Sequence, residues 1–178
     1  PYTKGSHDSD EEISDDVNMA EMRRNVLPLL EDGGVDLILS GHSHVYERSP
    51  LLSGHYGHSS TFDPDTMVID GGFGREGADG PYRKASVTGQ VFAVVGCSGK
   101  VDGTLTRHPA MWVSIKEVGS LVLKIEDQRL DASFLNRNGQ VGDTFSMEHI
   151  GTDMPDIAND VGATNVTYES ATLRGELI

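Results

Sequence analysis

The chain has 178 residues, of which 37% are hydrophobic, and its 28 acidic and 14 basic side chains give a formal net charge of −14. This acidic balance excludes nucleic acid or an anionic membrane surface as the main partner, because both require clustered lysine and arginine. The length predicts one domain, or one domain and part of another, and no apolar run reaches the ~18 residues of a membrane span.

The amino-terminal residues 1–10 are rich in glycine, serine and acids and predict a loop, which continues into an acidic run from Asp8 to Asp16. The run lacks an Asp-x-Asp-x-Asp-Gly pattern with a closing glutamate, so it does not indicate a calcium-binding loop. We expect a solvated loop that leads into a helix, whose positive N-terminal end favours carboxylates.

A helix is predicted next, because apolar residues recur at spacings of three and four. Its apolar face should consist of Met19, Met22, Val26, Leu29 and Leu30. Arg23 falls on the opposite face of this predicted helix. Pro28 should kink or divide the helix, and Gly33-Gly34 should end it.

Val35–Leu39 is almost wholly apolar and predicts a short strand that is covered on both faces, as in an α/β sheet. Residues 49–88 are rich in glycine, serine and histidine, and they predict a long loop with an ordered stretch only at 66–72. The second half is strand-rich: VFAVVGCSG predicts one strand, and residues 111–125 predict two. A hairpin with its turn at Asn138-Gly139 should follow, so this half should pair as antiparallel sheet.

Two histidines follow the first predicted strand directly, in the sequence SGHSH. Side chains at His42 and His44 face the same side if the backbone is extended, and Gly41 would allow a sharp turn before them. Neutral imidazole suits zinc, iron or manganese. A pair of histidines alone is weak evidence, and two polar residues on a turn would explain it as well.

The longer stretch VDLILSGHSHVYERS, residues 35–49, resembles the closing metal motif of the calcineurin-like metallophosphoesterases. Its YERS extension resembles the purple acid phosphatase branch of that family. The opening PYTKGSH, the segment 22–44 and GGFGREGADGPYRK at 71–84 are also similar to this branch. The resemblance covers residues 1–150.

This resemblance implies an α/β fold, α+β by content. Residues 1–150 would be the C-terminal half of a four-layer metallophosphoesterase β-sandwich flanked by helices. Within them, 1–48 would be an αβ unit with the metal motif, 49–88 a glycine-rich loop and 89–150 antiparallel strands. Residues 151–178 would be a linker and the truncated start of a fibronectin III-like β-sandwich.

The resemblance also implies a dinuclear centre of divalent or trivalent iron, zinc or manganese, whose activated hydroxide attacks phosphorus in a phosphorylated small molecule. His42 and His44 would be ligands, one to each metal. His7 would bind the phosphate or protonate the leaving oxygen, although an exposed loop histidine is an equal alternative. Arg48 is expected to pair with acidic side chains, and His55 and His58 either line the pocket or belong to a surface loop.

The chain departs from the family in its other metal motifs. The Asp-x-His, Gly-Asp and Gly-Asn-His segments that supply most ligands are absent, and two histidines fall short of the three ligands that a stable site requires. We therefore expect a fragment that is inactive alone. Its partner would be the missing N-terminal half of the domain, and an exposed sheet edge could lead to self-association.

Two other interpretations remain open at this stage. The acidic composition, the strand-rich second half and the sandwich-like tail would also suit an extracellular binding or adhesion module. A phosphatase-like fold that keeps His42 and His44 without catalysis is the second. For the enzyme we expect a secreted or periplasmic bacterial location.

Overall fold

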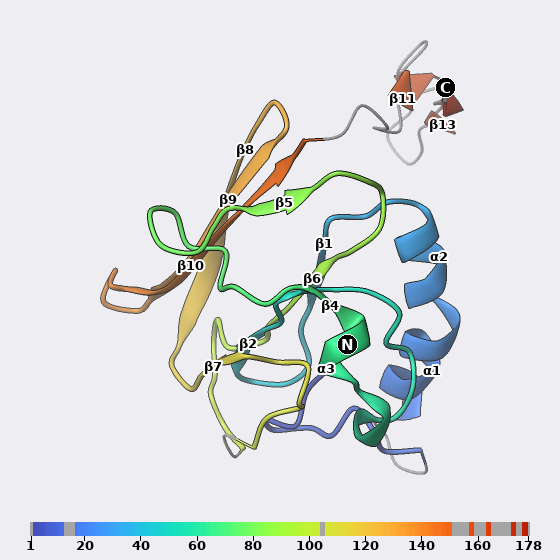
Figure 1. The fold of residues 1–178 in the computed structure, drawn as a ribbon. Helices are drawn as coiled ribbons and strands as arrows, with labels where there is room; N and C mark the ends of the chain where they lie inside the picture. Colours follow the sequence, from blue (N-terminus) through green and yellow to red (C-terminus); the bar gives the residue numbers. More distant parts are fainter. Residues whose placement is uncertain are drawn as a thin grey trace.

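The structure is a computed structural model, and it describes residues 2–12, 17–103 and 106–150 together with four short strands between 157 and 177. The helices α1 (Val17–Asn25) and α2 (Leu27–Asp32) lie beside one four-stranded sheet, and a second four-stranded sheet lies on its other side (Figure 1). The described part of the chain thus has mixed sheets and few helices. The four-layer sandwich stays a prediction.

The first sheet has the strand order β1-β6-β2-β7. Its strands are β1 (Leu37–Ser40), β6 (Val91–Val95), β2 (Tyr46–Arg48) and β7 (Val113–Ile115). Strand β1 runs parallel to β6, whereas β2 is antiparallel to both of its neighbours. The strand that precedes the two histidines is therefore an edge strand, and the strand that follows them is central.

The second sheet has the order β5-β10-β9-β8. Its strands are β5 (Tyr82–Lys84), β10 (Val141–His149), β9 (Arg129–Asn136) and β8 (Gly119–Glu126). The predicted antiparallel pairing is confirmed for β8, β9 and β10, while β5 joins β10 in parallel. The predicted turn at Asn138-Gly139 is also confirmed, with Gly139 at a φ of 76°.

Residues 49–88 hold more structure than the predicted loop. They contain β3 (Leu51–Leu52), η1 (Ser59–Thr61), α3 (Pro64–Met67) and β4 (Val68–Asp70) as well as β5. Strand β4 lies within the ordered stretch predicted at 66–72. The other elements have only two to four residues and are too short to leave a periodic pattern in a sequence, which is why the prediction missed them.

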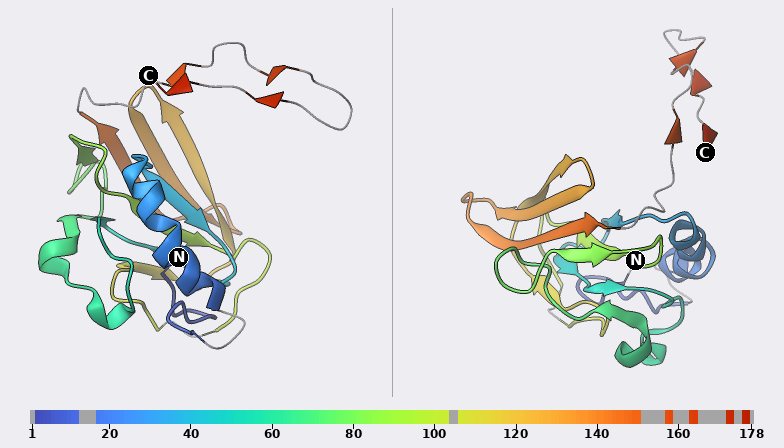
Figure 2. Two further views of the ribbon diagram at one scale, coloured as in Figure 1. Left: turned by 90° about the vertical axis from the view of Figure 1, so that its right-hand side faces the viewer. Right: turned by 45° about the horizontal axis from the view of Figure 1, so that its top comes forward.

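Beyond residue 150 the structure describes four two-residue strands. They are β11 (Ile157–Ala158), β12 (Ala163–Thr164), β13 (Thr172–Leu173) and β14 (Glu176–Leu177). Strand β11 pairs with β14 and β12 pairs with β13, both antiparallel, as the two views in Figure 2 allow the reader to follow. The rest of 151–178 lies outside the described residues, so the start of a second sandwich stays a prediction.

The predicted division of the first helix at Pro28 is confirmed, because α2 begins at Leu27 with proline in its first turn. The predicted apolar face is wrong in part: Met22 is 47% exposed, whereas Arg23 is fully buried. Helical periodicity could not reveal this, since the groups that accept the Arg23 guanidinium come from the preceding loop. Among the described helices, none is long and apolar enough to cross a membrane.

Three clusters of buried apolar residues lie in the described part of the chain, and the smallest consists of Tyr46, Cys97 and Phe134. The first lies between the helices and the first sheet and consists of Tyr2, Leu27, Leu52, Phe92, Val94, Ala110 and Met111. The second lies between the sheets and consists of Leu51, Tyr82, Val91, Ala132, Phe145 and Met147. Strand β6 contributes to the first and second clusters, because its alternate side chains point to opposite faces of the sheet.

Strand β1 is less covered than its sequence predicted. Leu39 is 49% exposed, and the other three residues of the strand are only partly buried. The prediction of a strand covered on both faces was wrong because it assumed an interior position. At the edge of the described sheet, β1 has one neighbour instead of two.

A buried ion pair joins the two sheets. Arg48 on β2 donates two hydrogen bonds to Asp143 on β10, at 2.6 Å from Nε and 3.0 Å from Nη2. Both side chains are almost fully buried, at 1% and 0% exposure. Tyr46 donates to the same carboxylate at 2.9 Å, and the Arg48 guanidinium lies 4.7 Å from the centre of the Phe145 ring. The prediction that Arg48 pairs with an acidic side chain is confirmed.

Imidazoles occur in the core as well. His55 and His108 are both fully buried, and their rings lie 5.2 Å and 5.1 Å from that of Tyr2. Burial lowers the pKa of His55 to about 4 and that of His108 to about 3. The charge of Arg23 lowers the pKa of His55 further, whereas the charge of Asp10 acts to raise the pKa of both histidines. These two histidines are therefore neutral in the folded chain near pH 7.

Replacing Asp143 by asparagine should destabilise the fold strongly. The substitution keeps the shape but leaves the Arg48 cation buried without a counter-charge, which costs about 3–5 kcal/mol. Urea unfolding followed by circular dichroism measures the loss. The matched control is Asp127→Asn, at an exposed turn residue whose φ of 50° asparagine tolerates. Equal stabilities of the two variants would contradict a structural role for the ion pair.

Folding stability should decrease as the pH falls from about 6.5 toward 4. In this window the unfolded chain protonates His55 and His108 near the ordinary histidine pKa, while the folded chain does not. Each of the two histidines should lower the free energy of unfolding by about 1.4 kcal/mol per pH unit in this window. Urea unfolding near pH 7, 6 and 5 measures the slope.

Removing one of these groups should make the slope shallower. In His108→Asn the amide oxygen can replace Nδ1, which accepts from the Ala110 amide at 3.2 Å. His58→Asn, at a side chain that is 52% exposed, is the matched control for the loss of an imidazole. A His108→Asn slope equal to that of the wild type would show that His108 titrates normally in the folded chain.

Candidate functional site

The two candidate ligands lie on a tight turn between β1 and β2. His42 is exposed and His44 is partly exposed, whereas Ser43 and Val45 are fully buried. The extended backbone assumed for the two histidines is wrong at His42. The sharp turn is at His42 itself, which has a φ of 70°. A Cβ at Gly41 would meet no atom within 4 Å, so the role predicted for this glycine is not supported. Non-glycine residues in this conformation are uncommon and often occur at functional sites.

His7 joins the pair from the amino-terminal segment. Its ring centre lies 3.8 Å from that of His42 and 6.3 Å from that of His44. The structure therefore brings together all three histidines that the sequence analysis assigned to the site. His42 and His44 come from one turn, while His7 comes from a different loop.

Hydroxyl groups attach the loop of His7 to the turn. The amide of His44 donates to Ser6 Oγ at 2.7 Å, and the amide of Ser6 donates to Ser43 Oγ at 3.0 Å. Thr3 Oγ1 lies 2.9 Å from Ser43 Oγ. Close packing adds to these bonds, because a Cβ on Gly5 would lie 2.5 Å from Val45 Cγ2. The two segments are thus held in one relative position.

The hydroxyl network ends at Glu47 on β2. This glutamate is fully buried and accepts a hydrogen bond from the Thr3 hydroxyl. Burial raises the pKa of Glu47 to about 7, although the bonds from Thr3 and from the Lys4 backbone oppose the shift. Glu47 faces the amino-terminal segment, whereas Tyr46 and Arg48 on either side of it both contact Asp143.

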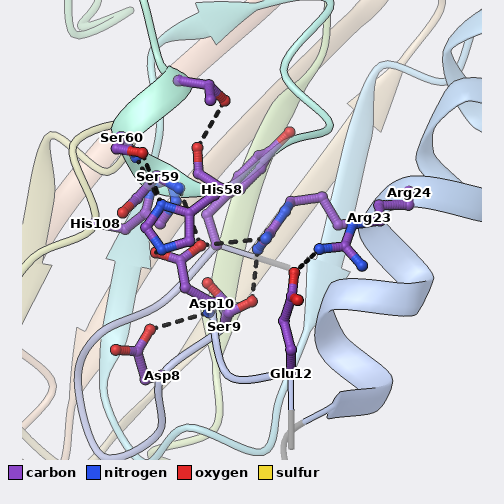
Figure 3. A network of polar contacts seen from close by, with 12 residues as sticks. Asp8, Ser9, Asp10, Glu12, Arg23, Arg24, His58, Ser59, Ser60 and His108 are labelled. Atoms are coloured by element: carbon purple, nitrogen blue, oxygen red, sulfur yellow. Dashed lines mark hydrogen bonds and ion pairs between the residues drawn. The ribbon is translucent and has the colours of Figure 1, made fainter.

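A second buried carboxylate holds the other end of the same loop. Asp10 accepts from Arg23 Nη2 at 3.2 Å and from the Ser59 amide at 3.0 Å, and Lys4 Nζ lies 2.9 Å from its Oδ2. Figure 3 shows Asp10 between Arg23 of α1 and the residues around η1. Burial alone would raise the pKa of Asp10, but the hydrogen bonds from Ser59 and Lys4 hold it well below its usual range. The predicted solvated acidic loop is therefore wrong at Asp10, whose side chain is 4% exposed.

The remaining part of the acidic run, residues 13–16, lies outside the described residues. The other two candidate pocket histidines do not join the site. His55 is in the core, and His58 is exposed and caps η1, with Nδ1 accepting from the Ser60 amide at 3.1 Å. For His58 the surface-loop alternative holds.

Sequence reasoning missed one neighbour of the candidate ligands. Asp102 Oδ1 lies 2.9 Å from Nδ1 of His44, across 58 positions of sequence. Asp102 is in the loop after β6, and its surroundings in the sequence, GKVDG, match no site motif that would have identified it. Only the pairing of β6 with β1 and β2 brings this loop to the histidine turn.

The donor set suits part of a metal centre. A neutral imidazole is a common ligand of zinc and iron, and a carboxylate on its second nitrogen is the usual arrangement around such a ligand. However, the described residues contain no group of three or more histidine, cysteine, aspartate or glutamate side chains that could hold a metal ion. His42 and His44 fit as two ligands of a centre that needs more.

Comparisons with known proteins place this site in context. No family model matches the chain. Purple acid phosphatase 18 of Arabidopsis thaliana is 38% identical over 77 residues, which are 43% of this chain and 16% of that protein. The structure of a purple acid phosphatase from yellow lupin (Lupinus luteus) seeds aligns with a TM-score of 0.47 and 19% identity, over 72% of this chain and 19% of that one.

The chain thus spans less than a fifth of the length of either protein. Over the 77 aligned residues it is similar in sequence to a purple acid phosphatase, and this relationship supports the resemblance that the histidine motif indicated.

Proposed function

We propose that this chain takes part in metal-dependent hydrolysis of phosphoesters, as part of a purple acid phosphatase-like centre. The observation that carries the proposal is the convergence of His42, His44 and His7 from two segments. The sequence relationship to a purple acid phosphatase supports the same chemistry. Because two histidines are too few for a stable site, the other ligands would come from outside the described residues.

Each histidine has a separate role in this proposal. His42 and His44 would each bind one of two ions, which when bound would supply an activated water nucleophile and neutralise charge on the phosphoryl oxygens. His7 would contact the phosphate or protonate the leaving oxygen. Its ring, whose centre lies 3.8 Å from that of His42 with the two planes tilted by 30°, supports a role beside this pair.

The network behind the turn would keep these groups in place. The bonds between Ser6, Ser43 and His44 fix the loop of His7 relative to the turn. The buried acceptors Glu47 and Asp10 hold that loop at both ends. Side chains held by a second layer of contacts lose less entropy when they bind a ligand, which favours a preformed pair of ligands.

Metal titration of the chain tests the ligand assignment. The wild-type chain should bind Zn²⁺ weakly, and His42→Asn with His44→Asn should lower the affinity by at least about tenfold, since loss of a supporting partner alone has that effect. Asparagine tolerates the φ of 70° at position 42. His58→Asn, at an exposed histidine outside the cluster, should bind as the wild type does. Unchanged Zn²⁺ affinity in the double variant would rule out these ligands.

Phosphatase assays test the reaction. The 178-residue chain alone should hydrolyse p-nitrophenyl phosphate negligibly with zinc, manganese or iron, because two imidazoles do not complete a site. A polypeptide that carries Asp-x-His, Gly-Asp and Gly-Asn-His segments should restore turnover, and the double histidine variant should abolish it. Strong turnover by the chain alone would contradict the proposal that its metal site is incomplete. If mixtures of the chain with such a polypeptide bind metal but none of them hydrolyses the substrate, this result would contradict the proposed hydrolase activity. It would favour a non-catalytic phosphatase-like fold.

A further inference from the structure

The loop that follows β6, residues 96–103, packs against both segments that carry the candidate ligands. A Cβ on Gly96 would lie 2.1 Å from the carbonyl oxygen of Ser43, in the histidine turn. A Cβ on Gly103, whose φ is 75°, would lie 2.3 Å from Cα of Ser6, beside His7. Backbone atoms approach this closely only where glycine is present, so the loop is built onto the site at both of its ends.

Asp102 projects from this loop to His44. Its Oδ1 lies 2.9 Å from His44 Nδ1, and its Oδ2 lies 2.5 Å from Lys100 Nζ. The loop is held from outside as well, because Lys116 Nζ donates to the carbonyl oxygen of Gly103 at 2.5 Å. Each carboxylate oxygen thus has one partner, and the carboxylate has little freedom to turn away from His44.

The charge of Asp102 decides which nitrogen of His44 carries a proton. The Lys100 ammonium at Oδ2 is a donor, and an aspartate side chain is ordinarily ionised near neutral pH. Near neutral pH the side chain is therefore a carboxylate, which can only accept hydrogen bonds. His44 Nδ1 must then be the donor, and in the neutral ring Nε2 keeps its lone pair.

We infer that Asp102 is a positioning residue that holds His44 in the tautomer with the proton on Nδ1, so that Nε2 is the atom that binds the metal ion. The inference rests on the proposed function, since it concerns a ligand of the same centre. It adds a residue that the histidine motif does not contain. Carboxylates that accept from the second nitrogen of a ligating histidine fix its orientation and increase its basicity.

The tautomer is measurable in the metal-free chain. In ¹⁵N-histidine-labelled protein, long-range ¹H–¹⁵N correlations should show the neutral His44 ring protonated on Nδ1, with the signals assigned by their loss in His44→Asn. In Asp102→Ala the acceptor is absent, and His44 should shift toward the Nε2-protonated form that predominates in free imidazole side chains. Asp102→Asn keeps the shape, but Lys100 favours the amide oxygen on its own side, so the amide NH2 would face His44 Nδ1 and should also favour the Nε2-protonated form. A shift of the tautomer in this nearly isosteric variant separates the effect from a loss of folding.

Zinc affinity gives a second readout on the same variants. Asp102→Ala should bind Zn²⁺ about 10–100-fold more weakly than the wild type, whereas Asp65→Ala, at an exposed carboxylate of α3, should show no change. A purely structural contact would alter stability but would leave the His44 tautomer as it is. The tautomer therefore distinguishes positioning from packing.

The outcomes for the two proposals differ. A wild-type His44 protonated on Nε2, or a doubly protonated ring, would overturn the inference, as would an Asp102→Ala chain with unchanged tautomer and unchanged Zn²⁺ affinity. If Asp102→Ala changes neither the tautomer nor the Zn²⁺ affinity, but Zn²⁺ binding still depends on His42 and His44, the proposed function remains intact. Conversely, a tautomer that changes in Asp102→Ala supports the inference, even if Zn²⁺ binding proves independent of His42 and contradicts the proposed ligand set.

Discussion

The buried pair of Arg48 and Asp143 is the interaction on which the arrangement of this chain depends. It joins the first sheet to the second through two charged hydrogen bonds, in a place from which water is excluded. Charges in such a place are tolerated only when each is neutralised and its hydrogen bonds are satisfied. The additional bonds from Tyr46 to Asp143 and from Arg48 to Tyr82 meet this condition.

The same strand carries the site. In β2, Tyr46 and Arg48 face the second sheet, while Glu47 between them faces the amino-terminal segment. The alternation of side chains along a strand thus lets three consecutive residues join two different parts of the molecule. The histidine turn comes directly before them, so its position is fixed by both sets of contacts.

Buried polar groups connect the amino-terminal loop to its surroundings in a similar way. Asp10 contacts α1 through Arg23 and the η1 region through Ser59, and Thr3 and Ser6 contact the histidine turn. Such networks rigidify a structure when their members are satisfied. Here they hold a short loop, with little apolar surface of its own, so that His7 rests on His42.

The sequence by itself determined the local features. It predicted the division of the helix at Pro28 and the hairpin turn at Asn138-Gly139, because propensity and periodicity act over a few residues. It also indicated the related family, through the motif at 35–49 that is continuous in the chain. Only the tertiary structure decided that Arg23 and Asp10 are buried, that β1 is an edge strand, and that Asp102 contacts His44. These depend on which distant segments meet, and a burial pattern or a carboxylate partner across 58 positions leaves no local trace in the sequence.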